Sequence, residues 1–322
     1  MSGNVAEARP RVLYVGGCGR SGSTLVDLIL GELPGFFSVG ELRFIWQRGL
    51  VENQLCGCGM PFRDCFFWSE VGARGFGGWG SIDGEEMAAL ERSVDRHRYL
   101  PFLLGPRLWA DYDARVERYT AVTTRLYRTI RSVSGCEVII DSTKDPPYAF
   151  LLRSAGEIDL RVIHLVRDSR GVAFSWTKVV RKPEAINEVA HMSRFRPVSM
   201  GARWMVYNSL FHVLERLGVP RTLLRYEEFV TFPRAELKRV LGDLGHSIDD
   251  RDLGFIRDGH VHLGIHHTVA GNPMRFKHGA VPLRIDDAWR TRLPPGQRAV
   301  VSLITRPLLR QYGYSKDSGG AR

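Results

Sequence analysis

The most informative segment of the chain runs Val12-Leu-Tyr-Val-Gly16-Gly17-Cys18-Gly19-Arg20-Ser21-Gly22-Ser23-Thr24-Leu25. A short apolar, β-branched run leads into a glycine-rich turn, and a helical pattern begins at about Ser23. The backbone N–H groups of such a turn, together with the N-terminus of the helix that follows, bind oxyanions. The sequence therefore predicts an anion-binding loop formed by Gly19, Arg20, Ser21, Gly22, Ser23 and Thr24.

This loop resembles the P-loop pattern G-x-x-x-x-G-K-[ST] but departs from it at one position. Gly17, Gly22 and Thr24 match, whereas Ser23 stands in the lysine position and the cation moves to Arg20. No acidic partner for magnesium is evident at a strand end. Phosphoryl transfer normally needs a metal ion to neutralise its charge, whereas a sulfuryl group carries less charge. A P-loop nucleotide kinase or hydrolase is therefore the weaker functional alternative. The purely structural alternative is that the loop is a tight glycine-rich turn with an ordinary helix cap.

Outward from this loop, short β-branched strands alternate with helical patterns, which is typical of a parallel sheet covered on both faces. We expect strands at Val12–Val15, Val138–Asp141, Val162–Val166 and Thr222–Tyr226. We expect helices at about Ser23–Leu33, Ser169–Val180, Gly201–Leu217, Arg234–Leu244 and Pro295–Tyr312. The predicted fold is thus an α/β, P-loop-like parallel sheet flanked by helices.

The predicted organisation is one α/β domain over residues 11–314, with a disordered N-terminus (1–10) and a flexible C-terminus (315–322). Residues 52–134 break the alternation of strands and helices. Cysteines and glycines come first there, and helical periodicity follows from about Glu85 to Ile130. We interpret this segment as a helical, cysteine-containing insertion over the cleft that shapes acceptor choice.

A second strand-to-helix junction lies at residues 162–176, where Arg167 follows a predicted strand and Ser175 lies about two turns into the next helix. Ligands of open α/β sheets bind at the carboxyl ends of the strands. An arginine and a serine at one such end can grip one phosphate together. The alternative is a surface ion pair between Arg167 and Asp168, with Ser175 facing solvent.

Together the two junctions resemble the sulfotransferases that use 3′-phosphoadenosine 5′-phosphosulfate (PAPS). Residues 19–24 resemble the family's 5′-phosphosulfate loop, and Arg167 to Ser175 matches its 3′-phosphate element of the form Arg-x7-Ser. The resemblance covers about Arg11–Trp46 and Val138–Glu228, with the insertion outside it. It implies transfer of a sulfuryl group from PAPS to a hydroxyl, without a metal ion.

The resemblance is closest to the branch of protein-tyrosine sulfotransferases and related bacterial enzymes. Gly40-Glu41-Leu42-Arg43 resembles a segment whose Glu is the catalytic base. Asp141-Ser-Thr-Lys144-Asp-Pro146 resembles an element whose Lys stabilises the transition state, and Leu224-Arg-Tyr226-Glu-Glu228 resembles one whose Tyr contacts the nucleotide. The resemblance thus implies catalytic roles for Glu41, Arg20 and Lys144, and nucleotide contact by Tyr226. Taken alone, Glu41 would be read as a capping or ion-pair residue and Lys144 as a surface lysine.

The chain departs from the cytosolic branch, which has a lysine in the first loop, a histidine base and a C-terminal Arg-Lys-Gly element. In place of that element stands a donor-rich segment, residues 266–277, which we call the 266–277 loop. From its composition and position we expect Asn272 and Arg275 to bind the cofactor. His266 or His267 could compete with Glu41 as the base, and an ordinary surface loop is the alternative.

The composition and charge of the chain indicate which kinds of partner it can bind. The chain has 322 residues, 44% hydrophobic and 25% charged, which is ordinary soluble usage. Its net charge of +10 is spread along the chain and indicates attraction to a small polyanion more than to nucleic acid. No segment reads as a membrane span or a secretory signal, so we expect a cytoplasmic protein without stable membrane insertion. The acceptor (a carbohydrate, a lipid or a secondary metabolite) and the oligomeric state are not indicated. A non-catalytic nucleotide-binding protein is the remaining alternative.

The five cysteines (Cys18, Cys56, Cys58, Cys65 and Cys136) are odd in number, and we expect them to be mostly reduced. Three of them cluster in Cys56-Gly-Cys58-Gly-Met-Pro-Phe-Arg-Asp-Cys65. A structural zinc site needs four ligands, and the nearest later candidate, His97, lies at no recognised spacing. We therefore favour packed thiols on the acceptor side over a disulfide or a metal site.

Overall fold

The computed structural model describes residues 9–105, 109–183 and 190–314. The predicted flexible C-terminus (315–322) and most of the predicted disordered N-terminus (1–10) lie outside the described residues. Pro10, however, is buried, and its carbonyl accepts a hydrogen bond of 3.0 Å from the backbone N–H of Asp159. The ordered chain therefore begins before Arg11, earlier than the sequence predicted.

A five-stranded parallel sheet forms the centre of the molecule, in the order β2-β3-β1-β4-β7. Its strands are β1 (Arg11–Gly16), β2 (Phe36–Gly40), β3 (Val138–Lys144), β4 (Asp159–Val166) and β7 (Arg221–Arg225). This confirms the predicted fold class and the four predicted strands. The edge strand β2 was missed because it contains Ser38, whose buried hydroxyl donates to Asp27 at 2.7 Å and gives the strand a polar appearance.

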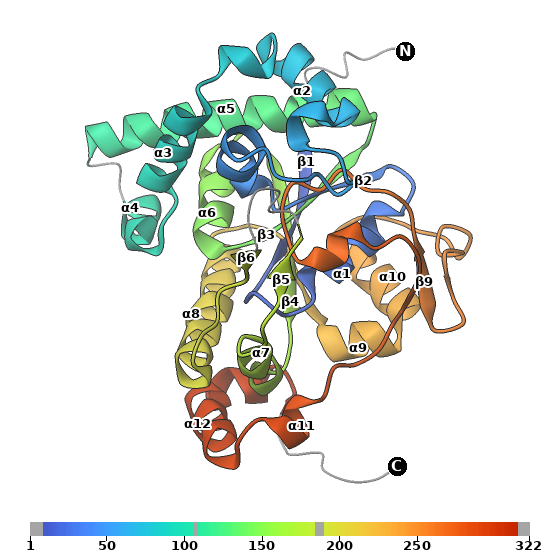
Figure 1. The fold of residues 1–322 in the computed structure, drawn as a ribbon. Helices are drawn as coiled ribbons and strands as arrows, with labels where there is room; N and C mark the ends of the chain where they lie inside the picture. Colours follow the sequence, from blue (N-terminus) through green and yellow to red (C-terminus); the bar gives the residue numbers. More distant parts are fainter. Residues whose placement is uncertain (1–8, 106–108, 184–189, 315–322) are drawn as a thin grey trace.

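Helices cover both faces of this sheet (Figure 1). Alternation along β1 divides its side chains between two cores: Val12 and Tyr14 belong to one, Leu13 and Val15 to the other. The first core is shared with α5 (Ala110–Ser134), α6 (Pro146–Ser154) and α8 (Pro197–Arg216). The second is shared with α1 (Ser23–Gly31), α9 (Tyr226–Thr231) and α10 (Pro233–Asp243).

Helices α7 and α6 show where the predictions fell short. Helix α7 (Ser169–Ser175) ends five residues before the predicted Val180, where the Trp176 indole turns to donate to the carbonyl of Gly19 at 3.0 Å. Helix α6 was missed because it begins with two prolines. Proline fits the first turn of a helix, where its missing N–H has no partner to lose.

The insertion packs onto the first core through α2 (Phe66–Phe76), α3 (Gly84–Val94), α4 (Leu100–Leu104) and α5. The helical periodicity predicted from about Glu85 to Ile130 is found as the separate helices α3, α4 and α5, with a 3-10 turn at His97–Tyr99 between α3 and α4. Arg43 joins this insertion to the sheet. Its buried guanidinium contacts the carboxylates of Glu91 at 3.0 Å, Asp95 at 2.6 Å and Asp145 at 2.5 Å.

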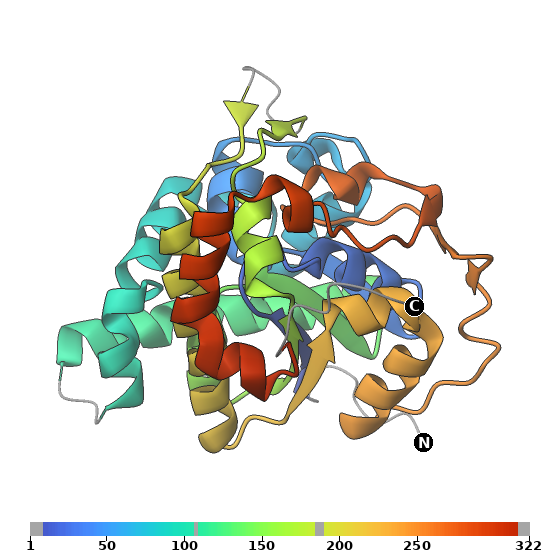
Figure 2. The ribbon, with the colours of Figure 1, turned by 90° about the horizontal axis from the view of Figure 1, so that it is seen from below.

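The second half of the chain adds small antiparallel strand pairings that the sequence did not reveal (Figure 2). A small antiparallel sheet consists of β8 (Ile256–Arg257), β9 (His260–Leu263) and β10 (Gly279–Pro282), and a hairpin consists of β5 (Arg181–Lys182) and β6 (Ala190–His191). The 266–277 loop connects β9 to β10 and contains the 3-10 turn η6 (Pro273–Phe276). Helices α11 (Trp289–Arg292) and α12 (Pro295–Gln311) close the fold beside α7 and α8.

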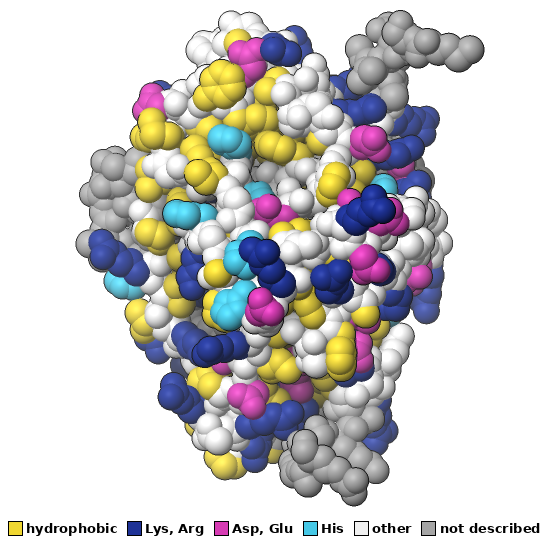
Figure 3. All heavy atoms as spheres, turned by 90° about the vertical axis from the view of Figure 1, so that its right-hand side faces the viewer, with side chains coloured by type: hydrophobic (Ala, Val, Ile, Leu, Met, Phe, Trp, Pro, Cys, Tyr) yellow, Lys and Arg dark blue, Asp and Glu magenta, His cyan; other side chains and the backbone are white. Residues whose placement is uncertain are grey.

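Within the described ranges, no helix combines the length and the apolar character needed to cross a bilayer. Figure 3 shows Lys and Arg side chains scattered over one face of the molecule among acidic and apolar ones. The positive excess on this face is thus dispersed and not gathered into one patch.

Candidate functional site

The loop after β1 is shaped by backbone conformations that bring it close to its neighbours. Gly22 has φ of 96°, and a Cβ there would lie 2.5 Å from the ring of Tyr226. Only glycine allows both this conformation and this close approach. Arg20 has φ of 71°, and Lys144, at the end of β3, has φ of 63°. Left-handed backbone at non-glycine residues is often concentrated at functional sites.

A cavity of about 310 Å³ lies at this carboxyl edge of the sheet. Its lining includes the predicted residues Gly19, Arg20, Gly22, Ser23, Thr24, Glu41, Lys144, Arg167, Ser175, Tyr226 and Asn272. The structure therefore brings together eleven of the thirteen predicted residues, from segments as distant as residues 19 and 272. The exceptions are Ser21, whose hydroxyl is buried beneath the loop, and Arg275.

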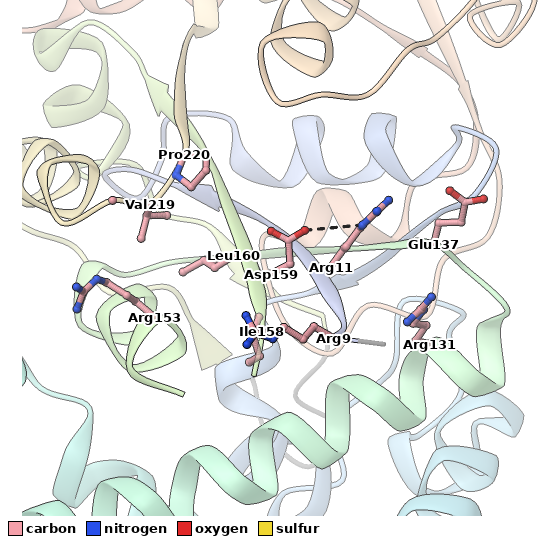
Figure 4. Close-up of a pocket in the computed structure, with 11 residues that line it drawn as sticks. Arg9, Arg11, Arg131, Glu137, Arg153, Ile158, Asp159, Leu160, Val219 and Pro220 are labelled. Carbon is pink, nitrogen blue, oxygen red and sulfur yellow. Dashed lines mark ion pairs between the residues drawn. The ribbon is translucent and has the colours of Figure 1, made fainter. Parts of the chain in front are cut away.

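A larger hollow of about 770 Å³ lies at the opposite edge of the sheet (Figure 4). Arg9, Arg11, Arg131 and Arg153 line it, and Arg11 pairs with Asp159 at 3.7 Å. It contains none of the predicted residues. Ligands of open α/β sheets bind at the carboxyl ends of the strands, so the smaller cavity is the candidate site.

Arg20 is the cation of the first loop, and part of its guanidinium has no hydrogen-bond partner among the described residues. Its Nε and Nη2 atoms are buried and donate to no group among the described residues. Its guanidinium lies over the ring of Trp176, 5.1 Å from the ring centre. Burial lowers the pKa of Arg20, and the charge of Glu41 partly opposes this. Because a buried unpaired donor is costly, these nitrogens indicate a site for a ligand oxyanion.

Glu41 and Lys144 meet within the cavity, since the Lys144 ammonium donates to Oε1 of Glu41. Glu41 follows Gly40, the last residue of β2, and its backbone N–H donates to the carbonyl of Ala270 at 3.3 Å. Gly40 has φ of 74° and lies against Thr268 and Ala270. An acid–base group and a cation from neighbouring strands thus lie side by side.

Arg167, which directly follows β4, is the third of these cations in the cavity. Its guanidinium donates to the carbonyls of Arg20 at 3.3 Å and Asp286 at 2.6 Å, and it stacks 4.8 Å from the ring centre of Tyr226. Burial raises the pKa of Tyr226. Ser175 lines the same cavity from the last turn of α7. The alternative of an Arg167–Asp168 surface pair is wrong, because Asp168 pairs with Arg170 at 2.7 Å.

The polar side chains of the 266–277 loop lie in different surroundings, and only some of them face the cavity. Asn272 lines the cavity, whereas Arg275 is buried and donates to the carbonyls of Thr268 at 2.7 Å and Leu55 at 2.6 Å. The structure thus places Arg275 at the attachment of the loop and away from the cavity, contrary to our expectation of cofactor binding. His266 pairs with Glu32 at 2.8 Å, and His267 lies 3.2 Å from the Cys65 sulfur. Neither imidazole lines the cavity.

Sequence reasoning missed five residues that line the cavity: Leu25, Trp176, Met192, Met274 and Asp286. Asp286 pairs with Arg167 at 3.3 Å and Lys178 at 2.9 Å. Burial would raise the pKa of Asp286, but Lys178 and Arg167 outweigh it and leave the pKa below its ordinary value. Leu25 and Trp176 directly follow the predicted residues Thr24 and Ser175, and Met274 lies between Asn272 and Arg275, so sequence position was the available signal for these three. Nothing in the sequence marks Met192 or Asp286.

The three clustered cysteines hold free thiols, as do Cys18 and Cys136. Cys56, Cys58 and Cys65 lie together with His267. His97, the next histidine along the chain after these cysteines, packs instead against Tyr207 with ring centres 5.0 Å apart.

Comparison with known proteins supports the fold. No family model and no curated protein sequence matches this chain. The sulfotransferase domain of the olefin synthase from Synechococcus PCC 7002 matches with a TM-score of 0.53 and 20% identity, over 96% of this chain and 97% of that domain. The sulfotransferase domain from the curacin biosynthetic pathway matches with a TM-score of 0.47 and 16% identity, over 94% of this chain and 98% of that domain. Sulfotransferase STF9 from Mycobacterium avium matches with a TM-score of 0.40 and 13% identity, over 76% of this chain and 66% of that protein. The first similarity confirms the fold that the resemblance implies.

Proposed function

We propose that this chain is a sulfotransferase that moves a sulfuryl group from PAPS to a hydroxyl of a small-molecule acceptor. One observation carries the proposal: three cations, Arg20, Lys144 and Arg167, line one cavity with the carboxylate of Glu41, which is in contact with Lys144. The other carboxylate among the described lining residues, Asp286, is paired with Arg167 and Lys178. The shared fold with a sulfotransferase domain supports it. The acceptor class is a carbohydrate, a lipid or a secondary metabolite.

The donor would occupy the two strand-to-helix junctions. The backbone N–H groups of residues 21–24 and the start of α1 suit the 5′-phosphate. Arg167 and Ser175 suit the 3′-phosphate and would distinguish PAPS from adenylates that lack it. The unpaired nitrogens of Arg20 support an oxyanion between these two positions.

In the proposed step, Glu41 accepts the proton of the acceptor hydroxyl as its oxygen bonds to sulfur. The bond between sulfur and the bridging oxygen breaks, and 3′-phosphoadenosine 5′-phosphate leaves with the electron pair. Arg20 and Lys144 stabilise the charge that develops on the bridging and equatorial oxygens. Since neither His266 nor His267 lines the cavity, Glu41 is the better placed base.

The alternative of a P-loop kinase gains no support at the end of β3. Asp145 directly follows this strand, but its carboxylate pairs with Arg43 at 2.5 Å, accepts from the Tyr207 hydroxyl at 3.1 Å and does not line the cavity. Within the strand, both oxygens of Asp141 are engaged. Oδ1 accepts from the Thr143 N–H at 2.8 Å, and Oδ2 accepts from the Tyr127 hydroxyl at 2.5 Å. It does not line the cavity and so offers no magnesium ligand there.

The test is calorimetric binding of 3′-phosphoadenosine 5′-phosphate and of ADP, in magnesium-free buffer. Losing one charged contact at a buried site costs about 2–5 kcal/mol, or about 30- to 4,000-fold in affinity. We expect Arg167→Ala to lose this amount for the 3′-phosphorylated nucleotide and little for ADP. Arg284→Ala, which removes an exposed arginine outside the cavity, is the control. Equal affinity for both nucleotides, or a magnesium requirement, would favour the kinase alternative.

A further inference from the structure

Four potential metal ligands from two distant parts of the chain meet beside the 266–277 loop. The sulfurs of Cys56, Cys58 and Cys65 and a ring nitrogen of His267 all lie within 4.8 Å of one another. The Cys58 and Cys65 sulfurs are 3.7 Å apart. His267 Nδ1 lies 3.2 Å from the Cys65 sulfur and 3.9 Å from the Cys56 sulfur.

These spacings match a tetrahedral zinc site. With Zn–S bonds of about 2.3 Å and Zn–N bonds of about 2.0–2.1 Å, tetrahedral angles separate two sulfurs by about 3.8 Å and a sulfur from a nitrogen by about 3.6 Å. The observed distances of 3.7, 3.2 and 3.9 Å scatter around these values. A disulfide would need sulfurs about 2.05 Å apart, so the same geometry does not fit one.

The surrounding residues hold the four ligands in place. The His267 ring stacks on Phe67 with centres 5.3 Å apart, and its backbone carbonyl accepts from the Trp68 indole at 3.0 Å. Between the first two cysteines, Gly57 donates to the carbonyl of Thr268 at 2.9 Å. A Cβ at Gly57 would lie 2.4 Å from the Thr268 hydroxyl, so only glycine allows the cysteine turn to approach the loop.

We propose that Cys56, Cys58, Cys65 and His267 bind one structural zinc ion that fastens the insertion to the 266–277 loop. Three sulfurs and one imidazole nitrogen are the ligand set that zinc prefers in closed structural sites. The thiols would release protons to solvent as thiolates bind the ion, and no redox step is involved. This site is separate from the proposed sulfuryl transfer, in which no metal ion takes part.

The proposal explains why a buried polar cluster joins two segments that are 202 residues apart. Arg275 already links the same two segments through Leu55 and Thr268. Asn272, in the same loop, lines the cavity, and Ala270 accepts from the N–H of Glu41. A zinc ion here would therefore fix the distance between the acceptor-side insertion and the base.

The experiment is metal analysis of the full chain, expressed with zinc and purified under reducing conditions. We expect about one equivalent of zinc per chain, and X-ray absorption with three sulfur ligands and one nitrogen ligand. Titration with Co²⁺ after zinc removal should give the visible absorption of a tetrahedral cobalt–thiolate site. Zinc below about 0.1 equivalent, together with failure to bind added Zn²⁺ or Co²⁺, would overturn the proposal, as would a bound iron ion.

Variants identify the ligands. Cys58→Ser should lose most of the zinc, whereas Cys136→Ser, at a buried thiol outside the cluster, should keep it. His267→Cys preserves four zinc ligands and should retain the metal even if His267→Ala fails to fold. Equal zinc loss in Cys58→Ser and Cys136→Ser would refute the assignment. Because the readout is metal content, the result is independent of whether the chain transfers sulfuryl groups.

Discussion

His164 should make the stability of this protein depend on pH. Its imidazole is buried in β4 between two fixed partners: Nε2 lies 2.8 Å from Oδ1 of Asn208, and Nδ1 lies 3.0 Å from a guanidinium nitrogen of Arg221. The Asn208 amide nitrogen donates to the carbonyl of Trp204 at 2.7 Å, which leaves Oδ1 facing the ring. Since arginine can only donate, Nδ1 must accept and the ring is neutral.

The magnitude follows from the pKa. Burial, followed by the charge of Arg221, lowers the pKa of His164 from 6.5 to about 3, and the nearby His212 acts in the same direction. As pH falls below 6.5, the unfolded chain binds a proton at this position and the folded chain does not, so acid favours unfolding. Between pH 7.5 and pH 5 this one group should remove about 2 kcal/mol from the free energy of unfolding.

The assay is equilibrium urea denaturation of wild type and His164→Gln at pH 7.5 and pH 5. Glutamine can donate and accept as the neutral imidazole does, but it does not titrate. All other titrating groups are common to both proteins, so wild type should lose about 2 kcal/mol more than the variant on acidification. His191→Gln, at an exposed histidine, controls for the loss of an imidazole. Parallel losses in wild type and His164→Gln would refute the reasoning.

Three further predictions concern the site and its supports. Glu41→Gln should lower the rate at which 3′-phosphoadenosine 5′-phosphate forms from PAPS by about 10²- to 10⁴-fold, measured with a panel of hydroxyl acceptors. Its nucleotide affinity should stay within about twofold of wild type. An equal loss of rate and affinity would contradict a base role for Glu41. Gly77→Ala should cost about 1 kcal/mol in urea denaturation because Gly77 has positive φ, and Gly22→Ala should cost more, because the positive φ and the close approach of its Cβ to Tyr226 both oppose it. Only Gly22→Ala should also weaken nucleotide binding in calorimetry, since its Cβ would strike Tyr226 whereas nothing lies within 4 Å of a Cβ at Gly77. Arg43→Met should cost about 3–5 kcal/mol because it removes the cation that Glu91, Asp95 and Asp145 share and leaves the buried Asp95 without its ion-pair partner. Arg74→Ala, at an exposed pair, should cost less than about 1 kcal/mol by the same measurement.

The central sheet could be predicted because β1, β3 and β4 are almost continuously buried and read as β-branched, apolar runs. Strand β2 escaped this rule, since Ser38 is buried through a hydrogen bond to Asp27 and is not apolar. The small sheet of β8, β9 and β10 escaped it as well, because strands of two to four residues are too short to show a pattern. Helix α6 was not predicted because it begins with Pro146 and Pro147, which interrupt helices in most contexts but fit the first turn of this one.

The candidate site could be predicted where its residues sit beside a recognisable strand end. Arg20 lies in the loop after β1, Lys144 is the last residue of β3 and Arg167 directly follows β4, so the sheet itself brings them together. Arg275 and His267 lie in an irregular loop, where no helical or strand periodicity allows the direction of a side chain to be predicted from the sequence. Arg275 therefore turned out to face Leu55, and His267 to face cysteines 202 residues earlier.

The 266–277 loop is the feature that joins the two halves of the proposed site. The Ala270 carbonyl accepts from Glu41 at 3.3 Å, and the Asn272 N–H donates to the Thr24 hydroxyl at 3.3 Å, so the base and the first loop depend on the same backbone. The other end of the loop is bound to the insertion through Thr268 and Gly57. A change of acceptor preference by substitution in the insertion must therefore leave this attachment intact, because any shift of the loop would displace Glu41 and the donor-binding loop together.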